Sequence, residues 1–331
     1  MKVVITGGAG YIGSTVASAC LDRGWTPVIL DDFSTGRREF VRGRLVYEGD
    51  VGDRALVERV FTEHPDIEGV VHCAARTVVH ESVSDPLAYY RANVTRSIEL
   101  VDALVGVGCP RIVFSSSAAV YAASPSLVVD ERAPLDPRSP YAVSKAMVER
   151  VLQDVVAAHP VRALALRYFN PVGADPQMRT GLQVAHPSHV LGSLLAAHEA
   201  GRPFTVHGSD WPTRDGSPVR DYVHVWDLAQ AHVLALAAFD DVCHDASPFT
   251  AVNIGSGTGT TVLELADAFA DVVGQPVEVV RGPRREGDVV GGAASSDRAR
   301  ELLGWKPELS LRDAIGDALR WREVRGERLG V

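Results

Sequence analysis

The chain has 331 residues, of which 46% are hydrophobic and 23% are charged, and its formal net charge is −9. This is ordinary globular composition, long enough for about two domains, and its acidic balance argues against a general affinity for nucleic acid or anionic membrane. The four cysteines lie apart without CxxC spacing, which predicts neither a metal site nor a disulfide framework. We find no signal-peptide pattern and no apolar run near ~18 residues, so we expect a cytoplasmic protein without a membrane span.

The N-terminal segment predicts a dinucleotide site. Residues 2–6 are typical of a buried strand, and Gly7-Gly8-Ala9-Gly10-Tyr11-Ile12-Gly13 follows and opens a helix. Glycines let the backbone approach a pyrophosphate, whose charge the N–H groups of the helix N-terminus can meet. Such a loop alone is weak evidence, but its position between the first strand and the first helix favours a dinucleotide.

A second strand, residues 25–30, ends at Asp31-Asp32. An acid at this position can bind a ribose 2′-hydroxyl and would repel a 2′-phosphate, which favours NAD over NADP, although Arg37 and Arg38 follow within reach. The alternative is that the aspartates cap the following turn. That alternative can hold for Asp32 while Asp31 binds ribose.

Strands and helices continue to alternate up to residue 105. We expect a strand over 45–51 with Asp50 at its end, a helix over 54–64, a strand over 69–74 and a helical segment over 86–105 that carries Asn93. This alternation predicts an α/β fold with a doubly wound parallel sheet of the Rossmann type. A buried helical asparagine usually satisfies backbone groups, so we place Asn93 near the cofactor in a structural role.

Residues 112–147 carry the candidate chemistry. A strand over 112–114 leads to Ser115, Ser116 and Ser117, and Ser139-Pro140 is typical of a helix start. Tyr141 and Lys145 then share one helix face. An ammonium beside a phenol favours the phenolate, and a serine hydroxyl at a strand end can donate to a developing alkoxide. Taken alone, however, Y-x-x-x-K more often marks a packing tyrosine and a solvated lysine.

After about residue 168 the alternation fades and proline and glycine become frequent. We expect an NAD-binding domain over 1–167 and a smaller α/β substrate domain over most of 168–331, above the carboxyl ends of the sheet. A strand–helix unit near 206–238 is expected to return to the first domain.

The chain resembles the extended short-chain dehydrogenase/reductases and, within them, the UDP-glucose (UDP-galactose) 4-epimerase family. The resemblance covers essentially the whole chain. Its motifs are TGGAGYIGS (6–14), EGDV (48–51), IVFSSSAAVYA (112–122), SPYAVSK (139–145), RYFNPVGA (167–174), VRDYVHVWDLA (219–229), NIGSG (253–257) and RREGD (284–288).

The resemblance implies a role for each matching residue. Ser117 matches the catalytic serine, Tyr141 the base and Lys145 its partner. The predicted cofactor-site residues are Gly7, Gly10, Tyr11, Ile12, Gly13, Asp31, Asp32, Asp50, Val51, Ala74, Ala75, Asn93, Tyr141, Lys145 and Phe169. The predicted substrate-site residues are Arg76, Ser117, Tyr141, Asn170, His189, Arg220, Arg285 and Gly292.

The implied reaction is epimerisation at C4 of a UDP-hexose. Tyr141 removes the C4 hydroxyl proton while C4 gives hydride to a tightly bound NAD, and hydride returns to the other face of the 4-keto sugar. Nucleotide-sugar 4,6-dehydratases and decarboxylases also begin by C4 oxidation, but place acids just after the catalytic serine, where this chain has Ala118-Ala119-Val120. A non-catalytic NAD-binding redox sensor is the alternative of another class, although it would have little need for Ser117, Tyr141 and Lys145 together.

Two departures from the family concern the sugar. The family's paired asparagines are replaced by Ser188-His189, and the side chain that limits the sugar pocket aligns with Gly292. Gly292 predicts room for UDP-N-acetylglucosamine or UDP-glucuronate, unless it is only a turn glycine beside Gly291. A uronate would need donors, for which Ser115, Ser116, Arg76, His186 and His189 are the candidates. The sequence leaves the sugar open, and the family favours a homodimer.

Overall fold

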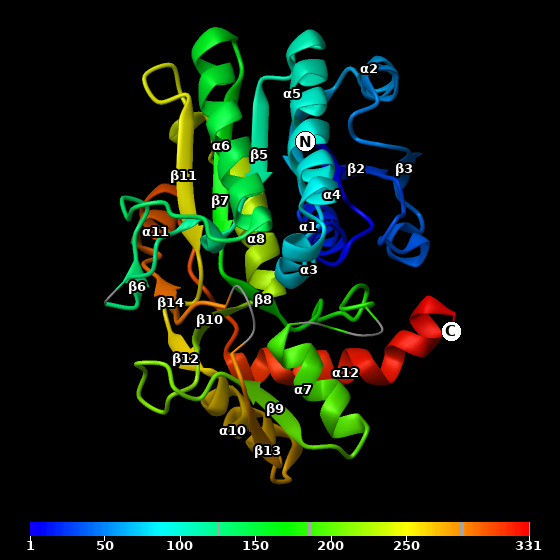
Figure 1. Cartoon of the computed structure of the whole chain (residues 1–331). Helices are drawn as coiled ribbons and strands as arrows, with labels where there is room; N and C mark the ends of the chain where they lie inside the picture. The colour runs from blue at the N-terminus through cyan, green and yellow to red at the C-terminus, as the bar shows by residue number, and fades with distance from the viewer. Residues whose placement is uncertain (125, 185–186, 188, 285–287, 331) are drawn as a thin grey trace.

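Seven parallel strands form the larger sheet of this computed structural model, which describes residues 1–124, 126–184, 187, 189–284 and 288–330 (Figure 1). Their order is β11-β7-β5-β4-β1-β2-β3. They are β1 (Lys2–Thr6), β2 (Thr26–Asp31), β3 (Leu45–Glu48), β4 (Ile67–His72), β5 (Arg111–Ser115), β7 (Arg162–Tyr168) and β11 (Phe249–Ile254). The strand order reverses between β1 and β4, which leaves a crevice at the carboxyl ends where doubly wound sheets bind ligands. The predicted doubly wound parallel sheet is confirmed.

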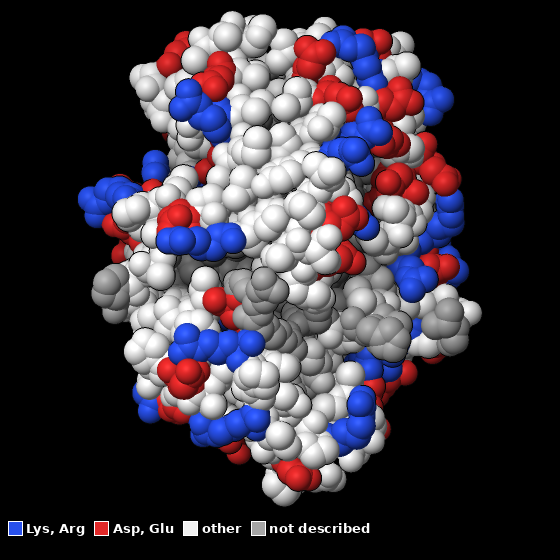
Figure 2. Space-filling view, viewed as in Figure 1, with Lys and Arg blue, Asp and Glu red and all other residues white. Residues whose placement is uncertain are grey.

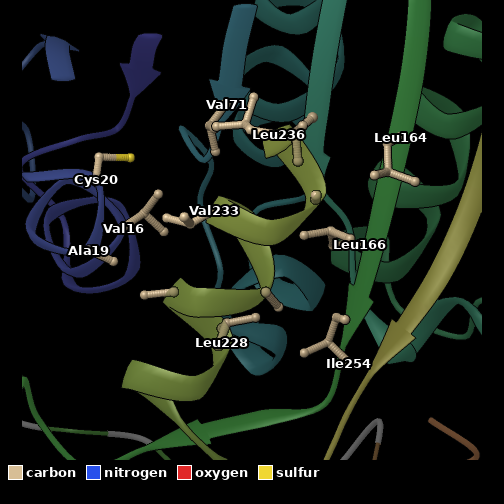
Figure 3. Packing of buried hydrophobic residues seen from close by; sticks show 14 of the residues in the cluster. Val16, Ala19, Cys20, Val71, Leu164, Leu166, Leu228, Val233, Leu236 and Ile254 are labelled. Carbon is tan, nitrogen blue, oxygen red and sulfur yellow. The ribbon is translucent and has the colours of Figure 1, made fainter. Parts of the chain in front are cut away.

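Helices cover both faces of this sheet because its strands are apolar on both sides. Successive strand residues point to opposite faces, so Val3 and Ile5 pack in one buried cluster and Val4 in another. The first cluster includes residues of α1 and α8, as Figure 3 shows, and the second includes residues of α2, α5 and α6. Burying each such side chain contributes about 1.5–3 kcal/mol.

The helices of this half are α1 (Tyr11–Asp22), α2 (Arg54–Glu63), α3 (Val79–Ser84), α4 (Pro86–Tyr90), α5 (Arg96–Gly106), α6 (Pro140–Ala158), α8 (Val225–Ala237), α9 (Phe239–Val242) and α11 (Asp297–Leu303). A π-helical turn (Arg91–Thr95) joins α4 to α5, so the predicted helical segment over 86–105 is continuous but not uniformly α-helical. Short 3-10 turns span Arg38–Val41 and Ala118–Val120.

A smaller half lies beyond the carboxyl ends of the large sheet (Figure 1). Its mixed sheet has the order β12-β10-β14-β6, with β8 also paired to β10, and β9 pairs with β13. These strands are β6 (Val128–Val129), β8 (Asn170–Val172), β9 (Phe204–His207), β10 (Val219–His224), β12 (Gly259–Thr261), β13 (Val279–Gly282) and β14 (Gly291–Ala294). Its helices, α7 (Val190–Glu199), α10 (Val262–Val273) and α12 (Leu311–Leu329), enclose a further apolar cluster.

The chain crosses between the halves more often than a division at residue 167 suggests. The helix of the expected return segment, α8, does pack on the large sheet, but the strands before it, β9 and β10, belong to the smaller half. The strand that returns is β11, which pairs with β7, and β6 crosses the other way to pair with β14. A local apolar pattern predicts a strand but not its partner, which is chosen by packing.

Among the described helices, none combines the length and the apolar composition needed to cross a bilayer. The described residues also hold no group of three or more His, Cys, Asp or Glu side chains that could bind a metal ion.

Candidate active site

The glycine loop packs so tightly that it excludes side chains at two positions. Gly7 has φ 66°, and a Cβ there would lie 2.7 Å from the backbone nitrogen of Ala74. A Cβ on Gly13 would lie 2.3 Å from the carbonyl oxygen of Gly7. Gly10 gives the N-terminus of α1 no side-chain cap, and Tyr11 beyond it donates from its hydroxyl to the carbonyl of Gly173 at 2.6 Å. An uncapped helix start behind a close-packed glycine turn is suited to an anionic pyrophosphate.

Asp31 stands beside this loop at the end of β2. Its buried carboxylate accepts hydrogen bonds from the Ala9 N–H at 2.9 Å and the Phe33 N–H at 2.8 Å. Burial raises the pKa of Asp31, and these two bonds oppose the rise. Asp32 instead accepts from the backbone N–H and hydroxyl of Ser34. Both aspartates therefore cap the following turn, and Asp31 also binds the glycine loop; its contact with a ribose stays a prediction.

The other predicted cofactor residues follow the neighbouring strands. β3 ends at Glu48, and Asp50 lies in the turn beyond it, where it accepts from the Gly52 N–H at 2.8 Å and pairs with Arg96 at 3.0 Å. Val51 is buried in the cluster under α2 and α5. Ile12 packs at the edge of the cluster between α1 and α8, and Phe169 follows β7 and packs against a separate small cluster of Val120, Tyr121 and Val129.

Asn93 holds the loop that follows β4. Its side-chain oxygen accepts from the Arg76 N–H at 2.8 Å, and its amide donates to the Arg76 carbonyl at 2.9 Å and to the Ser144 hydroxyl at 3.0 Å. These bonds connect the loop that contains Ala74 and Ala75 to α6. They agree with a structural role for Asn93, and its direct contact with a cofactor stays a prediction.

Ser117, Tyr141 and Lys145 meet where β5 ends against α6. The predicted helix start is confirmed, because Ser139 caps α6 by accepting from the Ala142 N–H at 3.2 Å and Pro140 is its first residue. Tyr141 and Lys145 are 6% and 3% exposed. The Ser117 hydroxyl lies near enough to Tyr141 to lower the pKa of the phenol.

The ionisation of this group is governed first by burial. Burial lowers the pKa of Lys145 to about 8. Burial also raises the pKa of Tyr141, and the hydrogen bond from Ser117 offsets part of that rise. The sequence predicts a lowered phenol pKa from the neighbouring ammonium, but Lys145 donates instead to the Ser115 carbonyl at 2.8 Å. The chain's own charges therefore do not outweigh the burial of Tyr141.

Ser115 and Ser116 are fully buried, and their hydroxyls bind other parts of the protein. Ser115 Oγ lies 2.9 Å from His232 Nε2 and 3.1 Å from Cys73 Sγ, and Ser116 Oγ donates to Glu149 at 2.5 Å. The prediction that these two serines could donate to a substrate carboxylate is therefore wrong.

The predicted substrate residues lie in and around the smaller half. Asn170, in β8, donates to the Asp221 carbonyl at 3.2 Å. Arg220, in β10, donates to the carbonyls of Val219 at 2.8 Å and Val289 at 3.2 Å. The structure thus holds Arg220 along the segment that precedes β14, where its guanidinium also lies 3.8 Å from Asp288.

Arg76 and His189 were expected to donate to a substrate carboxylate, but the structure gives them other contacts. Arg76 is exposed, with its guanidinium 3.9 Å from Asp85. His189 caps α7 by accepting from the Gly192 N–H at Nδ1, 3.1 Å away, and its ring lines a cavity of about 10 Å³ beside Tyr11. Burial lowers the pKa of His189 to about 4, so it is a neutral cap rather than a cation for a carboxylate. Arg285, His186 and Ser188 lie outside the described residues.

Gly292 is a strand glycine. The sequence predicts either a widened sugar pocket or a turn at this position, and the structure differs from both predictions. It lies in β14 opposite Arg220, and a Cβ there would lie 2.9 Å from the Leu127 carbonyl oxygen. The turn-like backbone belongs to Gly291, with φ 90°. The glycine is explained by the close approach of Leu127, so the position gives no support for a widened sugar pocket.

Three buried polar residues beneath the site were missed by the sequence analysis, namely Glu149, Arg167 and His232. Glu149 had a signal, because it falls one turn after Lys145 on the same helix face. Arg167 and His232 had none, because their partners are distant in sequence.

Fold and site together define a dinucleotide-dependent enzyme of the doubly wound class. The model of the NAD dependent epimerase/dehydratase family matches residues 3–255, and the chain belongs to that family. It is 41% identical over 332 residues to a UDP-glucose 4-epimerase from Azospirillum brasilense, a match that covers 99% of this chain and 94% of the relative.

Solved structures are similar over nearly the full length. A UDP-glucose-4-epimerase from Stenotrophomonas maltophila, with bound NAD and formylated UDP-arabinopyranose, has a TM-score of 0.93 and 35% identity and covers 99% of each chain. A UDP-glucose 4-epimerase from Bifidobacterium longum, in complex with NAD+ and UDP, has a TM-score of 0.90 and 33% identity and covers 98% of each chain.

Proposed function

We propose that this chain is a UDP-hexose 4-epimerase that interconverts UDP-glucose and UDP-galactose and retains NAD between turnovers. One observation carries the proposal. Ser117, Tyr141 and Lys145 converge at the carboxyl end of β5, in a chain similar to UDP-glucose 4-epimerases over almost its whole length. A fold match alone would not assign the chemistry.

The cofactor site fits NAD. The N-terminus of α1 would meet the pyrophosphate, and Asp31 would accept a hydrogen bond from the adenosine ribose. When bound, NAD supplies the acceptor that takes hydride from C4 of the sugar and returns it. The residues of the chain bind and orient NAD and the sugar, and they transfer the proton of the C4 hydroxyl.

Tyr141 is the proposed base for the C4 hydroxyl. Burial raises its pKa, so the phenolate needs positive charge nearby. Lys145 supplies one such charge on the same helix face, and an oxidised nicotinamide would add a second. Ser117 donates to the oxygen on which charge develops and passes the proton between that oxygen and Tyr141.

Hydride leaves one face of C4 and returns to the other, so the sugar ring must turn over in the site. The substrate is therefore held best through its diphosphate. We propose Asn170 and Arg220, with Arg285, for this contact, since guanidinium groups match diphosphate geometry. Arg220 now donates to the Val219 and Val289 carbonyls, and it would exchange the Val289 bond for phosphate oxygen on binding.

Elimination or decarboxylation would need an acid close to Ser117. The 3-10 turn after Ser117 consists of Ala118, Ala119 and Val120, none of which can transfer a proton. The proposal therefore keeps epimerisation as the reaction.

The homodimer expected from the family has a suitable surface. Large apolar side chains on the helices around α6 are exposed, namely Val79, Val83, Leu87, Ile98 and Met147, and Leu87 is 62% exposed. Figure 2 shows a largely uncharged strip over α4, α5 and α6. We propose that this strip joins two copies of the chain.

Sedimentation tests the dimer. Leu87→Glu and Met147→Glu should convert dimer to monomer, whereas Val280→Glu, at an exposed apolar position in the smaller half, should not. A wild-type monomer at micromolar concentration, or equal effects of all three variants, would count against the interface.

Isomerisation without added NAD tests the function. Purified protein is incubated with UDP-galactose, and the anomeric protons of both sugars are followed by NMR. We expect UDP-glucose to form until equilibrium, and denatured protein to release NAD(H). Release of NAD(H) with no change in the sugar would instead indicate the redox sensor.

A further inference from the structure

A buried ion pair lies directly beneath the serines at the end of β5. Arg167 donates to Glu149 from Nε at 3.0 Å and from Nη2 at 2.6 Å, and the two residues are 4% and 1% exposed. Ser116 donates to the same carboxylate. Burying two charges costs about as much as their attraction returns, so stability alone does not account for this pair.

The pair belongs to a longer network that crosses the sheet. Arg167 Nη1 donates to the Tyr121 hydroxyl at 3.0 Å, and Tyr121 donates to the Asn253 side chain at 2.6 Å. Asn253 in turn donates to the Val129 carbonyl at 3.1 Å. The network thereby connects α6 with β5, β7, β11 and β6, and Glu149 is its member on α6.

Glu149 is placed to act on both partners of the proton-transfer group. It lies one turn after Lys145 on α6, on the same face. Through Ser116 it binds the serine segment. In that segment Ser115 accepts from Lys145, and the hydroxyl of Ser117 lowers the pKa of Tyr141. One carboxylate therefore ties the serine segment to the helix that carries the base.

The groups that face Lys145 leave Glu149 as its counter-charge. Cys73 and His72 approach from β4, and burial raises the pKa of Cys73 to about 11 and lowers that of His72 to about 3, so both are neutral near pH 8. Burial also raises the pKa values of Tyr141 on α6 and Tyr168 on β7, so both phenols are neutral at that pH. Burial lowers the pKa of Lys145, and Cys73 and then Glu149 oppose that lowering; of these two groups, Glu149 is the carboxylate.

We propose that Glu149 is a positioning residue of the active site, which fixes the serine segment to α6 and supplies a negative charge one turn from Lys145. The inference rests on the proposed function, because the turnover that it concerns is the epimerase reaction. Its direct test measures the titration midpoint of Lys145, which does not depend on the substrate. The inference and the proposed function can therefore fail separately.

The chain has only three lysines, Lys2, Lys145 and Lys306, so NMR of protein labelled with ¹³C at lysine Cε gives three signals to follow against pH. In the wild type, we expect Lys145 to titrate near pH 8. Glu149→Gln keeps the shape and removes the charge, and it should lower that midpoint, because a nearby opposite charge favours the ammonium form. The alkaline limb of kcat should move down with it, while KM for UDP-galactose should stay within about threefold because no substrate contact is changed.

Two variants separate charge from hydrogen bonding. Ser116→Ala removes one hydrogen bond to Glu149 but keeps the carboxylate, so kcat should fall without a change in the Lys145 midpoint. Asp154→Asn removes an exposed carboxylate from the same helix, where it pairs with Arg150, and should change neither quantity.

A lower melting temperature for Glu149→Gln with an unchanged Lys145 midpoint would overturn the proposal and leave Glu149 a structural partner of Arg167. If the single variant does not fold, Glu149→Gln/Arg167→Met removes the unpaired cation as well, and a lower kcat with KM for UDP-galactose unchanged then tests the positioning half of the proposal. Full activity of Ser116→Ala would overturn the positioning half of the proposal.

Discussion

Two glycines, both inside α-helices, should respond oppositely to alanine. Alanine gains about 0.5–1 kcal/mol over glycine in a helix interior. At Gly316 in α12 no heavy atom lies within 4 Å of the new Cβ, so Gly316→Ala should show that gain. At Gly13 in α1 the Cβ would lie 2.3 Å from the Gly7 oxygen and 2.9 Å from the Gly8 Cα.

These contacts are with backbone, so no side-chain rotation relieves them. Overpacking costs about 1–3 kcal/mol, which leaves a net loss of up to about 2.5 kcal/mol for Gly13→Ala after the helix gain. The glycine loop must also move, so the variant should lose NAD(H) during purification. Urea unfolding at matched cofactor content measures the difference, because a bound ligand itself adds stability. Equal stability of Gly13→Ala and Gly316→Ala, with NAD(H) retained in both, would refute the close-packing argument.

Outcomes are expected for four further variants. Tyr141→Phe should abolish turnover without unfolding the protein, and Ser117→Ala should lower kcat by about 10²–10³-fold, the effect of losing one donor to a developing oxyanion; substantial kcat in Tyr141→Phe would exclude it as the base. Gly292→Tyr should lower turnover of UDP-glucose and UDP-N-acetylglucosamine alike, since its Cβ meets the Leu127 carbonyl, and a loss confined to the larger sugar would restore the pocket prediction. Burial lowers the pKa of His232 to about 4 from 6.5, so its contribution to stability is full above pH 6.5 and is lost as the pH falls towards 4. In urea unfolding between these values, His232→Gln should reduce the slope of stability against pH by about 1.4 kcal/mol per unit, and an unchanged slope would mean that His232 is not buried neutral.

The sequence predicts what depends on near neighbours. β1 and the capped start of α6 agree with their expected bounds, because a short apolar run and a Ser-Pro start are local signals. The convergence of Ser117 with Tyr141 also follows, since strand ends and helix starts meet at one edge of a doubly wound sheet.

The sequence could not predict the contacts between residues that only folding brings together. The hydroxyls of Ser115 and Ser116 look available until His232 and Glu149 are placed against them. Gly292 looks like a missing pocket wall until the backbone of Leu127 is seen beside it. In each case the decisive neighbour is distant along the chain or lies on another element. A local sequence pattern does not show which side of that element faces the residue.

The pairing of β11 with β7 has a consequence for how the protein is made. β7 is apolar along most of its length, and the edge to which β11 pairs stays uncovered until residues 249–254 have been synthesised. At about 5–20 residues per second, translation of the segment in between takes roughly 4–16 s. During that interval a nascent chain exposes an unpaired strand edge of the kind on which aggregation begins. Chaperone demand during expression should therefore be set by the time between these two strands, and synonymous changes that slow translation between them should lower soluble yield without altering the finished enzyme.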